Sequence, residues 1–274
     1  MLVPSKMPVL TLRILTAVVL LAVIVPAITI APGWLWLLFC IAAAIACSIE
    51  WSGLSGAKGL YKVLVPCVTG GAVAIFICFP YYARWIYWPA MLIWILVSTI
   101  VISQRTSDLN SVLKVLAGMI VIIAAIVALS ALRSASPLSL IALMAIVWIS
   151  DTSAYAFGKA FGRSKLAPRI SPGKTWEGVA GAIFAVCIYG GILRFIFPAV
   201  LEPLDGIRDQ SDAAFFATWV ALAIAGVLGD LGESWAKRVA GVKDSGKMLP
   251  GHGGALDRVD ALLPVLPLAA LIYL

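Results

Sequence analysis

Long uninterrupted apolar runs dominate this chain and decide what it can fold into. About 20 apolar residues are enough to cross the hydrocarbon core of a membrane as a helix, and a helix satisfies its own backbone hydrogen bonds there. The chain has nine runs near that length and lacks the alternating segments of a membrane barrel. The runs cover residues 12–30, 34–49, 63–79, 85–103, 115–132, 138–157, 179–197, 213–229 and 255–274. We therefore predict an all-α, polytopic integral membrane protein with about nine transmembrane helices.

Composition supports this class and excludes others. Only 12% of the 274 residues are charged, against about 25% in a typical soluble domain. The first run is too long for the apolar core of a signal peptide and no A-x-A site follows it, so we expect a retained first span. The five cysteines lie in apolar segments without metal-ligand spacing, so we expect neither a disulfide framework nor a zinc site.

The basic residues predict the orientation of the spans. With the N-terminus in the cytoplasm, 16 of the 20 Lys and Arg residues fall on the cytoplasmic side, as the positive-inside rule requires. We therefore predict an N-in, C-out topology. Polar chemistry is confined to the second half, so we divide one continuous membrane domain into a scaffold of about five helices, 1–137, and a catalytic region, 138–274. The catalytic region carries two basic cytoplasmic stretches, 158–178 and 230–254.

Asp151 is an acid within an otherwise apolar run, "WISDTSAYAFGK". Such a group is costly in a membrane and usually faces a cavity or a partner. We predict a functional carboxylate, with a residue at the cytoplasmic end of a span as the alternative.

The segment "ISPGKTWEG", residues 170–178, precedes a new apolar run. A Ser/Thr-rich turn at a helix start offers N–H groups to a phosphate, and Lys174 adds a cation. We expect Ser171-Pro172-Gly173 to turn the chain, and Ser171, Lys174, Thr175 and Glu177 to bind substrate. The spacing is not that of a Walker loop. A capped helix start beside anionic headgroups is the alternative.

Two pairs of acids flank the second basic stretch. Asp230 and Glu233, and likewise Asp257 and Asp260, are three residues apart, so each pair shares a helix face. If the last helix begins near Ala255, its 20 residues extend about 30 Å, and its acids lie at membrane depth. Carboxylates gathered at one depth repel each other unless a cation lies among them, and oxygen ligands favour Mg²⁺ over zinc.

Between these acids lie cations and the glycine-rich segment "GKMLPGHGG". Lys237, Arg238 and Lys243 suit a polyphosphate, and glycine lets the backbone approach a ligand closely. For His252 we favour a phosphate or substrate contact over a catalytic base. Together these features predict phosphoryl or nucleotidyl transfer. A basic loop on anionic lipid is the alternative, but it leaves the acids at membrane depth unexplained.

The residues from Ser234 to Asp260 resemble the signature of the phosphatidate cytidylyltransferases, the CDP-diacylglycerol synthases. The matching elements are Ser234, Lys237-Arg238, Lys243-Asp244, P-G-H-G-G at 250–254, and Asp257-Arg258-x-Asp260. The "SPGKTWEG" and "DTSAYAFGK" segments look like the same family, whereas the first five spans match it only in hydropathy. Many relatives carry a second lysine where this chain has Gly173, so we expect Lys165 or Arg169 to supply that contact or the contact to be missing.

The resemblance implies that CTP and phosphatidic acid react with Mg²⁺ to give CDP-diacylglycerol and pyrophosphate. It implies metal ligands at Asp230 and Asp257, with Asp260 and Asp244 as the next candidates, and leaves an additional monovalent cation open. The implied partners are these substrates and membrane lipid, without nucleic acid, and a homodimer is left open. The implied location is the inner membrane of a bacterium, with the active site on the cytoplasmic side.

These expectations define the predicted site. Its catalytic residues are Asp230, Lys237, Arg238, Asp257 and Asp260. Its substrate-binding residues are Asp151, Ser171, Lys174, Thr175, Glu177, Ser234, Lys243, Asp244, His252, Gly253 and Arg258.

Two other functions fit parts of the pattern. A CDP-alcohol phosphotransferase requires a D-G-x-x-A-R core, of which only Asp205-Gly206 is present. An ion-coupled transporter could use Asp151, Asp230 and Asp257 as a relay, but transporters usually show related polarity in both halves. We therefore prefer the cytidylyltransferase function over these two, with direct attack of the lipid phosphate on CTP.

Overall fold

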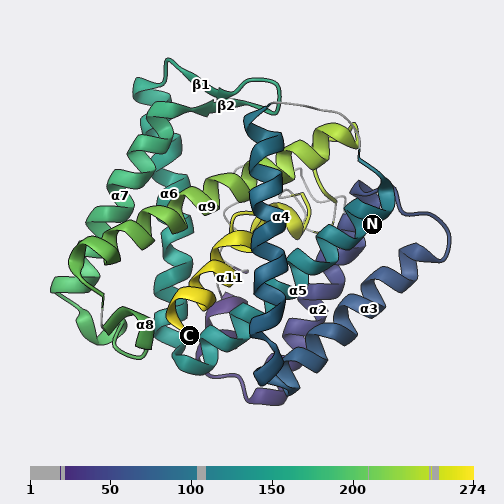
Figure 1. The fold of residues 1–274 in the computed structure, drawn as a ribbon, viewed down its shortest axis with the longest axis horizontal. Coiled ribbons are helices and arrows are strands. Elements are labelled where there is room, and N and C mark those ends of the chain that lie inside the picture. Colours follow the sequence, from purple (N-terminus) through teal and green to yellow (C-terminus); the bar gives the residue numbers. More distant parts are fainter. Residues whose placement is uncertain (1–18, 20–21, 104–108, 209, 247, 249–252) are drawn as a thin grey trace, which may run out of the picture.

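The computed structural model describes residues 19, 22–103, 109–208, 210–246, 248 and 253–274, and in them the chain is almost entirely helical (Figure 1). Residues 22–29 are helical ahead of α2. The long helices are α2 (Gly33–Leu54), α3 (Tyr61–Cys78), α4 (Arg84–Ile102), α5 (Ser111–Ala135), α6 (Pro137–Phe161), α7 (Trp176–Phe195) and α9 (Asp212–Val239). The shorter elements are η1 (Pro80–Tyr82), β1 (Lys165–Ala167), β2 (Ser171–Thr175), η2 (Pro198–Val200), α8 (Asp205–Arg208), α10 (Leu256–Val259) and α11 (Leu262–Tyr273).

The structure confirms an all-α polytopic membrane fold. Within the described ranges, seven helices are long and apolar enough to cross a membrane. Nine of the 19 residues of the first predicted run, 12–30, lie outside the described residues. The count of nine spans and the N-in, C-out orientation stay predictions.

Local sequence signals explain where several helices begin. The Asn110 side chain accepts a hydrogen bond from the backbone N–H of Val112, 2.8 Å away, at the start of α5. Ser136 and Ser211 cap α6 and α9 in the same way, and Pro137 follows Ser136 at a position where its missing N–H costs nothing. Such caps satisfy donors that have no partner inside the helix.

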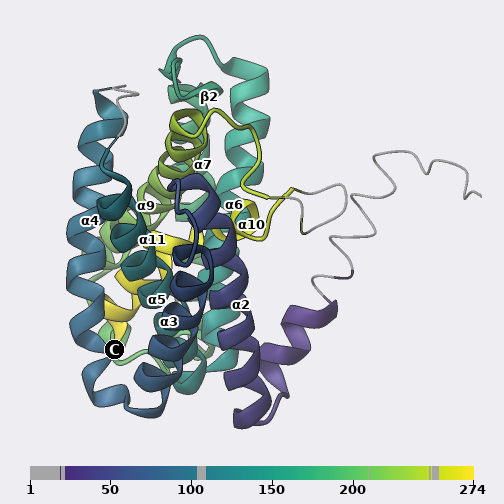
Figure 2. The same ribbon diagram turned by 90° about the vertical axis from the view of Figure 1, so that its right-hand side faces the viewer.

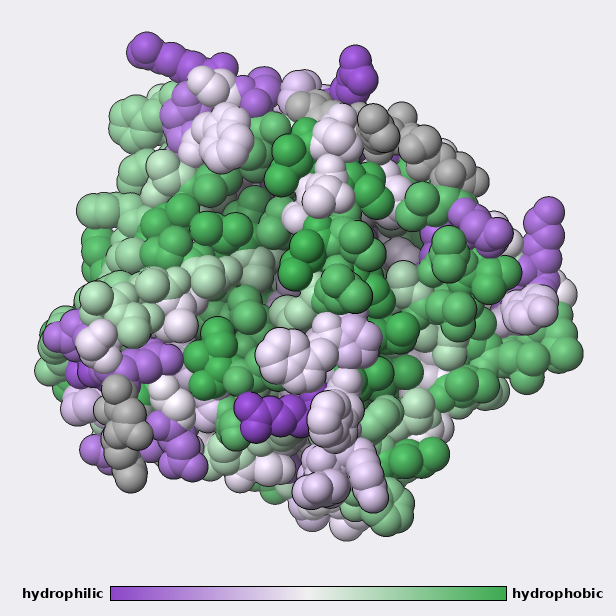
Figure 3. Space-filling view, viewed as in Figure 1, coloured by the Kyte–Doolittle hydropathy of each residue, from purple (hydrophilic) through white to green (hydrophobic). Residues whose placement is uncertain are grey.

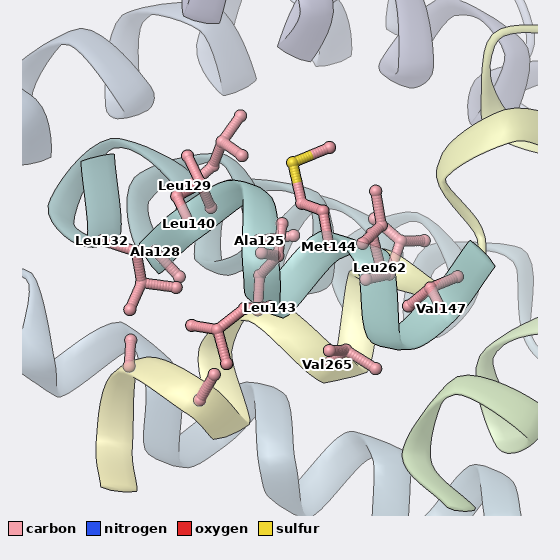
Figure 4. Close-up of a cluster of buried hydrophobic side chains, with 14 of the residues drawn as sticks. Ala125, Ala128, Leu129, Leu132, Leu140, Leu143, Met144, Val147, Leu262 and Val265 are labelled. Carbon is pink, nitrogen blue, oxygen red and sulfur yellow. The ribbon is translucent and has the colours of Figure 1, made fainter. Parts of the chain in front are cut away.

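The core joins the two predicted regions of the chain. Helix α5 packs against α2, α3, α4, α6 and α11. Figure 4 shows Ala125 and Ala128 of α5 beside Leu143 of α6 and Leu262 and Val265 of α11. All five are buried in one continuous apolar cluster. The predicted catalytic region, 138–274, therefore shares its hydrophobic core with the N-terminal helices.

The outer surface is suited to lipid. The face in Figure 3 is largely hydrophobic, with hydrophilic residues mainly toward its margins. Along α4, large apolar side chains are more than half exposed, including Trp85, Leu92, Ile95 and Ile102. A soluble monomer rarely exposes so continuous an apolar surface, whereas membrane contact requires one.

A small hairpin corrects the predicted turn at Ser171-Pro172-Gly173. These residues lie in strand β2, which pairs antiparallel with β1 in the register Lys165 with Thr175. The prediction was wrong because Pro and Gly were taken as turn formers, while the two-stranded pairing places them in extended backbone. Helix α7 then begins directly after β2, capped by Thr175, whose hydroxyl accepts from the N–H of Gly178.

The last apolar run is not one 20-residue helix. It is divided into α10 and the twelve-residue α11, and α11 is only about 18 Å long. Pro264 explains the division, because proline offers no N–H to the carbonyl four residues earlier and its ring crowds that carbonyl. The affected oxygen, that of Asp260, accepts from Leu263 N at 3.3 Å instead.

Gly229 lets α9 pack directly on this break. A Cβ at Gly229 would meet the Asp260 carbonyl oxygen, and would lie 2.9 Å from both Ala261 Cα and Pro264 Cδ. These neighbours are backbone and a proline ring, so they yield little. The glycine therefore holds the acids of α9 close to Asp260.

Gly229→Ala is expected to destabilise the protein by about 2 kcal/mol, because the added methyl overpacks a backbone contact. The midpoint of thermal unfolding in detergent measures the effect. Gly71→Ala is the matched control, since a Cβ at Gly71, also within a long helix, has nothing within 4 Å. An equal midpoint for both variants would contradict the close contact.

Candidate active site

Charged side chains gather along the C-terminal part of α9. Asp230, Glu233 and Lys237 are three and seven residues apart, and this spacing places them on one helix face. The ammonium of Lys237 lies 2.6 Å from Glu233 Oε2 and 2.6 Å from Asp257 Oδ1. Lys237 therefore links the predicted acids of α9 to those of α10.

A second cation pairs with Asp230. Lys174 of β2 lies with its Nζ 2.7 Å from Asp230 Oδ2, and it also donates to the carbonyl of Val227 at 3.3 Å. Ser234 donates its hydroxyl to Asp230 Oδ1 at 3.3 Å. Asp151 of α6 is near enough for the charges of Asp230 and Lys174 to act on it. The hairpin, α6 and α9 thus bring four predicted residues together.

Asp257 is held by several donors. Its Oδ2 accepts from Ser245 N at 3.0 Å, Ser245 Oγ at 2.9 Å and Gly254 N at 2.8 Å. Burial favours the neutral acid, but the Lys237 ammonium and these N–H groups outweigh it and lower the pKa of Asp257 to about 2. Asp257 is therefore a carboxylate throughout the physiological range. Gly253, beside it, has φ +81°, a conformation that glycine adopts without strain.

Asp260 follows α10 and lies in a different environment. Burial, together with the charge of Asp230, raises the pKa of Asp260. Glu233 is near enough for the charge of Asp260 to act on it, and Glu233 Oε1 is buried without a hydrogen-bond donor among the described residues. The carboxylate oxygens of Asp260 and Glu233 outnumber the hydrogen-bond donors described around them. This favours binding of a proton or a cation here.

Glu50 is a member of the site that the sequence analysis missed. It lies near the end of α2, is only 5% exposed, and accepts from Ser245 Oγ and from the backbone N–H groups of Ala255 and Leu256. The one available signal was an acid directly after an apolar run, in the half of the chain that was assigned to a scaffold.

The remaining predicted residues lie on the hairpin, at helix ends or at the surface. Arg238 donates to the Ile170 carbonyl at 3.2 Å and so ties α9 to the hairpin. Glu177 accepts from the N–H of Ser164, and Thr175 caps α7. Ser171 is half-buried in β2, whereas Lys243, Asp244 and Arg258 are exposed. His252 lies outside the described residues. The substrate contacts predicted for these residues stay predictions.

Carboxylates of the kind that Mg²⁺ prefers are present, and the unpartnered Glu233 Oε1 is a candidate ligand. In the described part of the chain, however, no group of three or more His, Cys, Asp or Glu side chains is arranged to hold a metal ion. Asp230 and Asp257 each bind a lysine instead. A metal at these two acids would therefore compete with Lys174 and Lys237.

An apolar cavity of about 540 Å³ adjoins Glu233. It lies between α4, α5 and α9, and its lining includes Trp51, Trp94, Leu113 and Gly232. Its size is within the usual range for small-molecule sites, and its lining suits hydrocarbon. Polar and apolar environments therefore meet at this part of α9.

Comparisons with known proteins point to one family. The model of the cytidylyltransferase family matches residues 11–274. A phosphatidate cytidylyltransferase of Haemophilus influenzae is 44% identical over 128 residues, which are 47% of this chain and 43% of that protein. The protein of that name from Brucella abortus is 46% identical over 136 residues, 50% of this chain and 46% of its own. One from Thermotoga maritima is 43% identical over 126 residues, 46% and 45%. The chain thus aligns with less than half the length of each relative.

Proposed function

Because this chain belongs to the cytidylyltransferase family, we propose that it transfers the cytidylyl group of CTP to phosphatidate. The products would be CDP-diacylglycerol and pyrophosphate. The relatives named phosphatidate cytidylyltransferase support this choice, and family membership disfavours the transporter and CDP-alcohol phosphotransferase alternatives. The proposal rests on the position of Lys237. Its ammonium contacts Glu233 of α9 and Asp257 of α10 beside an apolar cavity.

The proposed reaction is a direct in-line displacement. A phosphate oxygen of the lipid forms a bond to the α-phosphorus of CTP, and the bond from that phosphorus to the bridging oxygen of the β-phosphate breaks. Pyrophosphate leaves with the electron pair. The nucleophile is already an anion, so the site must neutralise and orient two anions and has no need of a strong base.

Lys174 and Lys237 are suited to that task. An ammonium has three donors. The hydrogen bonds described above use two on each lysine, to Asp230 and the Val227 carbonyl and to Glu233 and Asp257. One donor on each remains for a phosphate oxygen. The acids hold the two cations in place before the substrate arrives, and such preorganisation is a large part of electrostatic catalysis.

We also propose that Mg²⁺ takes part, held by Asp230 and Asp257 with Asp260 and Glu233 nearby. A bound Mg²⁺ would supply positive charge for the triphosphate and the leaving pyrophosphate. The carboxylate oxygens and the unpartnered Glu233 Oε1 support this assignment.

The apolar surface and the bacterial relatives support a location in a bacterial inner membrane, with the site facing the cytoplasm. The lipid headgroup would then meet CTP at the charged cluster. The cavity beside Glu233 would accommodate part of the hydrocarbon of the lipid.

Labelled CTP tests the proposal directly. With purified protein, phosphatidate vesicles and Mg²⁺, label on the α-phosphate is expected to enter the lipid fraction, and label on the γ-phosphate to appear in pyrophosphate. Omitting phosphatidate should abolish both transfers. Release of CMP from added CDP-diacylglycerol, with transfer of its phosphatidyl group to an added alcohol, would instead identify a phosphotransferase.

A further inference from the structure

Glu50 spans the longest sequence separation at the site. Its Oε2 lies 2.9 Å from Ser245 Oγ and 2.8 Å from Leu256 N, and its Oε1 lies 2.9 Å from Ala255 N. The three donors are 195 to 206 residues away along the chain. One carboxylate of α2 therefore holds both sides of the segment that precedes α10.

Two glycines of this segment pack against the same carboxylate. A Cβ at Gly246 would have only Glu50 atoms as its nearest neighbours, with the carboxyl carbon at 2.6 Å. A Cβ at Gly254 would lie 2.7 Å from that carbon. Neither glycine has positive φ, so the requirement for glycine comes from the close approach to Glu50 and, at Gly254, also to the Ser245 hydroxyl.

The position of α10 explains why an acid is needed there. In Figure 2, α10 lies part-way along the bundle and not at its end. The first N–H groups of a helix have no partner within it, and a buried N–H without a partner is costly. Glu50 accepts from two of them, those of Ala255 and the fully buried Leu256.

The contacts continue from Glu50 to Asp257. The Ser245 hydroxyl lies 2.9 Å from Glu50 Oε2 and 2.9 Å from Asp257 Oδ2. Asp257 directly follows Leu256, whose N–H donates to Glu50. We infer that Glu50 is a positioning residue: it fixes Ser245 and the start of α10, and thereby sets the place of Asp257 relative to Lys237. The activity arm of the test rests on the proposed function.

Glu50→Gln tests the inference with little change of volume. The amide replaces one acceptor oxygen by a donor, which faces the N–H of Ala255 or of Leu256. We expect kcat to fall about 30-fold, since a small displacement of a reacting group costs up to about 100-fold, and the KM for CTP to change less than about threefold. Glu50→Asp, which keeps both oxygens on a shorter stem, should recover part of kcat. Ser52→Ala, on the same helix, is the control, because in the described part of the chain its hydroxyl bonds only to Ser48 O.

Hydrogen exchange supplies a measurement that does not depend on turnover. The Ala255 and Leu256 amides should exchange faster in Glu50→Gln and at the wild-type rate in Ser52→Ala. If exchange at these amides rises in Glu50→Gln but the wild type does not transfer label from CTP to lipid, the proposed function fails. The role of Glu50 in positioning α10 then stands. Unchanged exchange at these amides in Glu50→Gln would overturn the positioning role.

Gly246→Ala gives an independent check. In the wild-type background its methyl would displace Glu50, and we expect a loss of kcat similar to that of Glu50→Gln. In a Glu50→Ala background the methyl no longer meets the carboxylate, so it should add almost no further loss. Coupled residues show such non-additivity. Two losses that multiply would mean that Gly246 acts without Glu50.

Discussion

Asp257→Asn is expected to lower turnover about 1000-fold, the largest effect we expect from one substitution, because it removes a charge at the proposed reacting centre. The asparagine keeps the shape but offers one acceptor where Asp257 offers two. Those two oxygens now serve Lys237, Ser245 and Gly254. The low pKa of Asp257 means that the wild-type group is charged at any pH suitable for assay. Transfer of α-phosphate label from CTP to lipid measures the loss.

Asp212→Asn is the matched control for that experiment. Asp212 begins the same helix, α9, and pairs with Arg194 at 3.2 Å, far along the chain from the charged cluster. It should keep full activity, and both variants should enter the membrane fraction in wild-type amounts. If Asp257→Asn retains more than about a tenth of the wild-type rate, Asp257 cannot hold an essential charge at the reaction.

The charged face of α9 could be predicted because its geometry is local. A helix of regular pitch places residues three, four and seven positions apart on one side, so Asp230, Glu233 and Lys237 had to share a face wherever α9 packed. The meeting of α9 with Asp257 was expected from the acid pairs at one depth. The contact between Lys237 and Asp257 depends on how the elements pack, and no spacing in the sequence gives it.

The parts that the sequence did not predict depend on contacts between distant segments. Strand β2 exists only because Lys165–Ala167 lies beside it, and "SPGKT" read alone has the composition of a turn. Pro264 was a local signal for the break before α11, but it lies in an apolar run that was predicted to form one helix. The role of Glu50 depends on the packing of α2 beside α10, about 200 residues away in the sequence.

Lys237→Met is expected to lower the thermal midpoint by about 10 °C as well as turnover by more than about 100-fold. The side chains of Lys237, Glu233 and Asp257 are 14%, 2% and 8% exposed. Removing one partner of a buried ion pair typically costs about 3–5 kcal/mol because the remaining charge is left unpaired. In a chain of this length each kcal/mol shifts the midpoint by about 2–4 °C. Thermal unfolding in detergent measures the effect.

Two further variants separate the stabilising role of Lys237 from its role in the reaction. Lys237→Met combined with Glu233→Gln removes one of the two buried charges left behind, so it should recover several degrees of the midpoint while turnover stays low. Lys237→Arg keeps the charge, but a planar guanidinium does not replace a compact ammonium between two carboxylates. We therefore expect nearly wild-type stability and turnover at least about tenfold lower. A Lys237→Met midpoint within about 2 °C of the wild type would mean that the acids are neutralised by something other than this lysine, and the electrostatic link between α9 and α10 would then have to be assigned to another group.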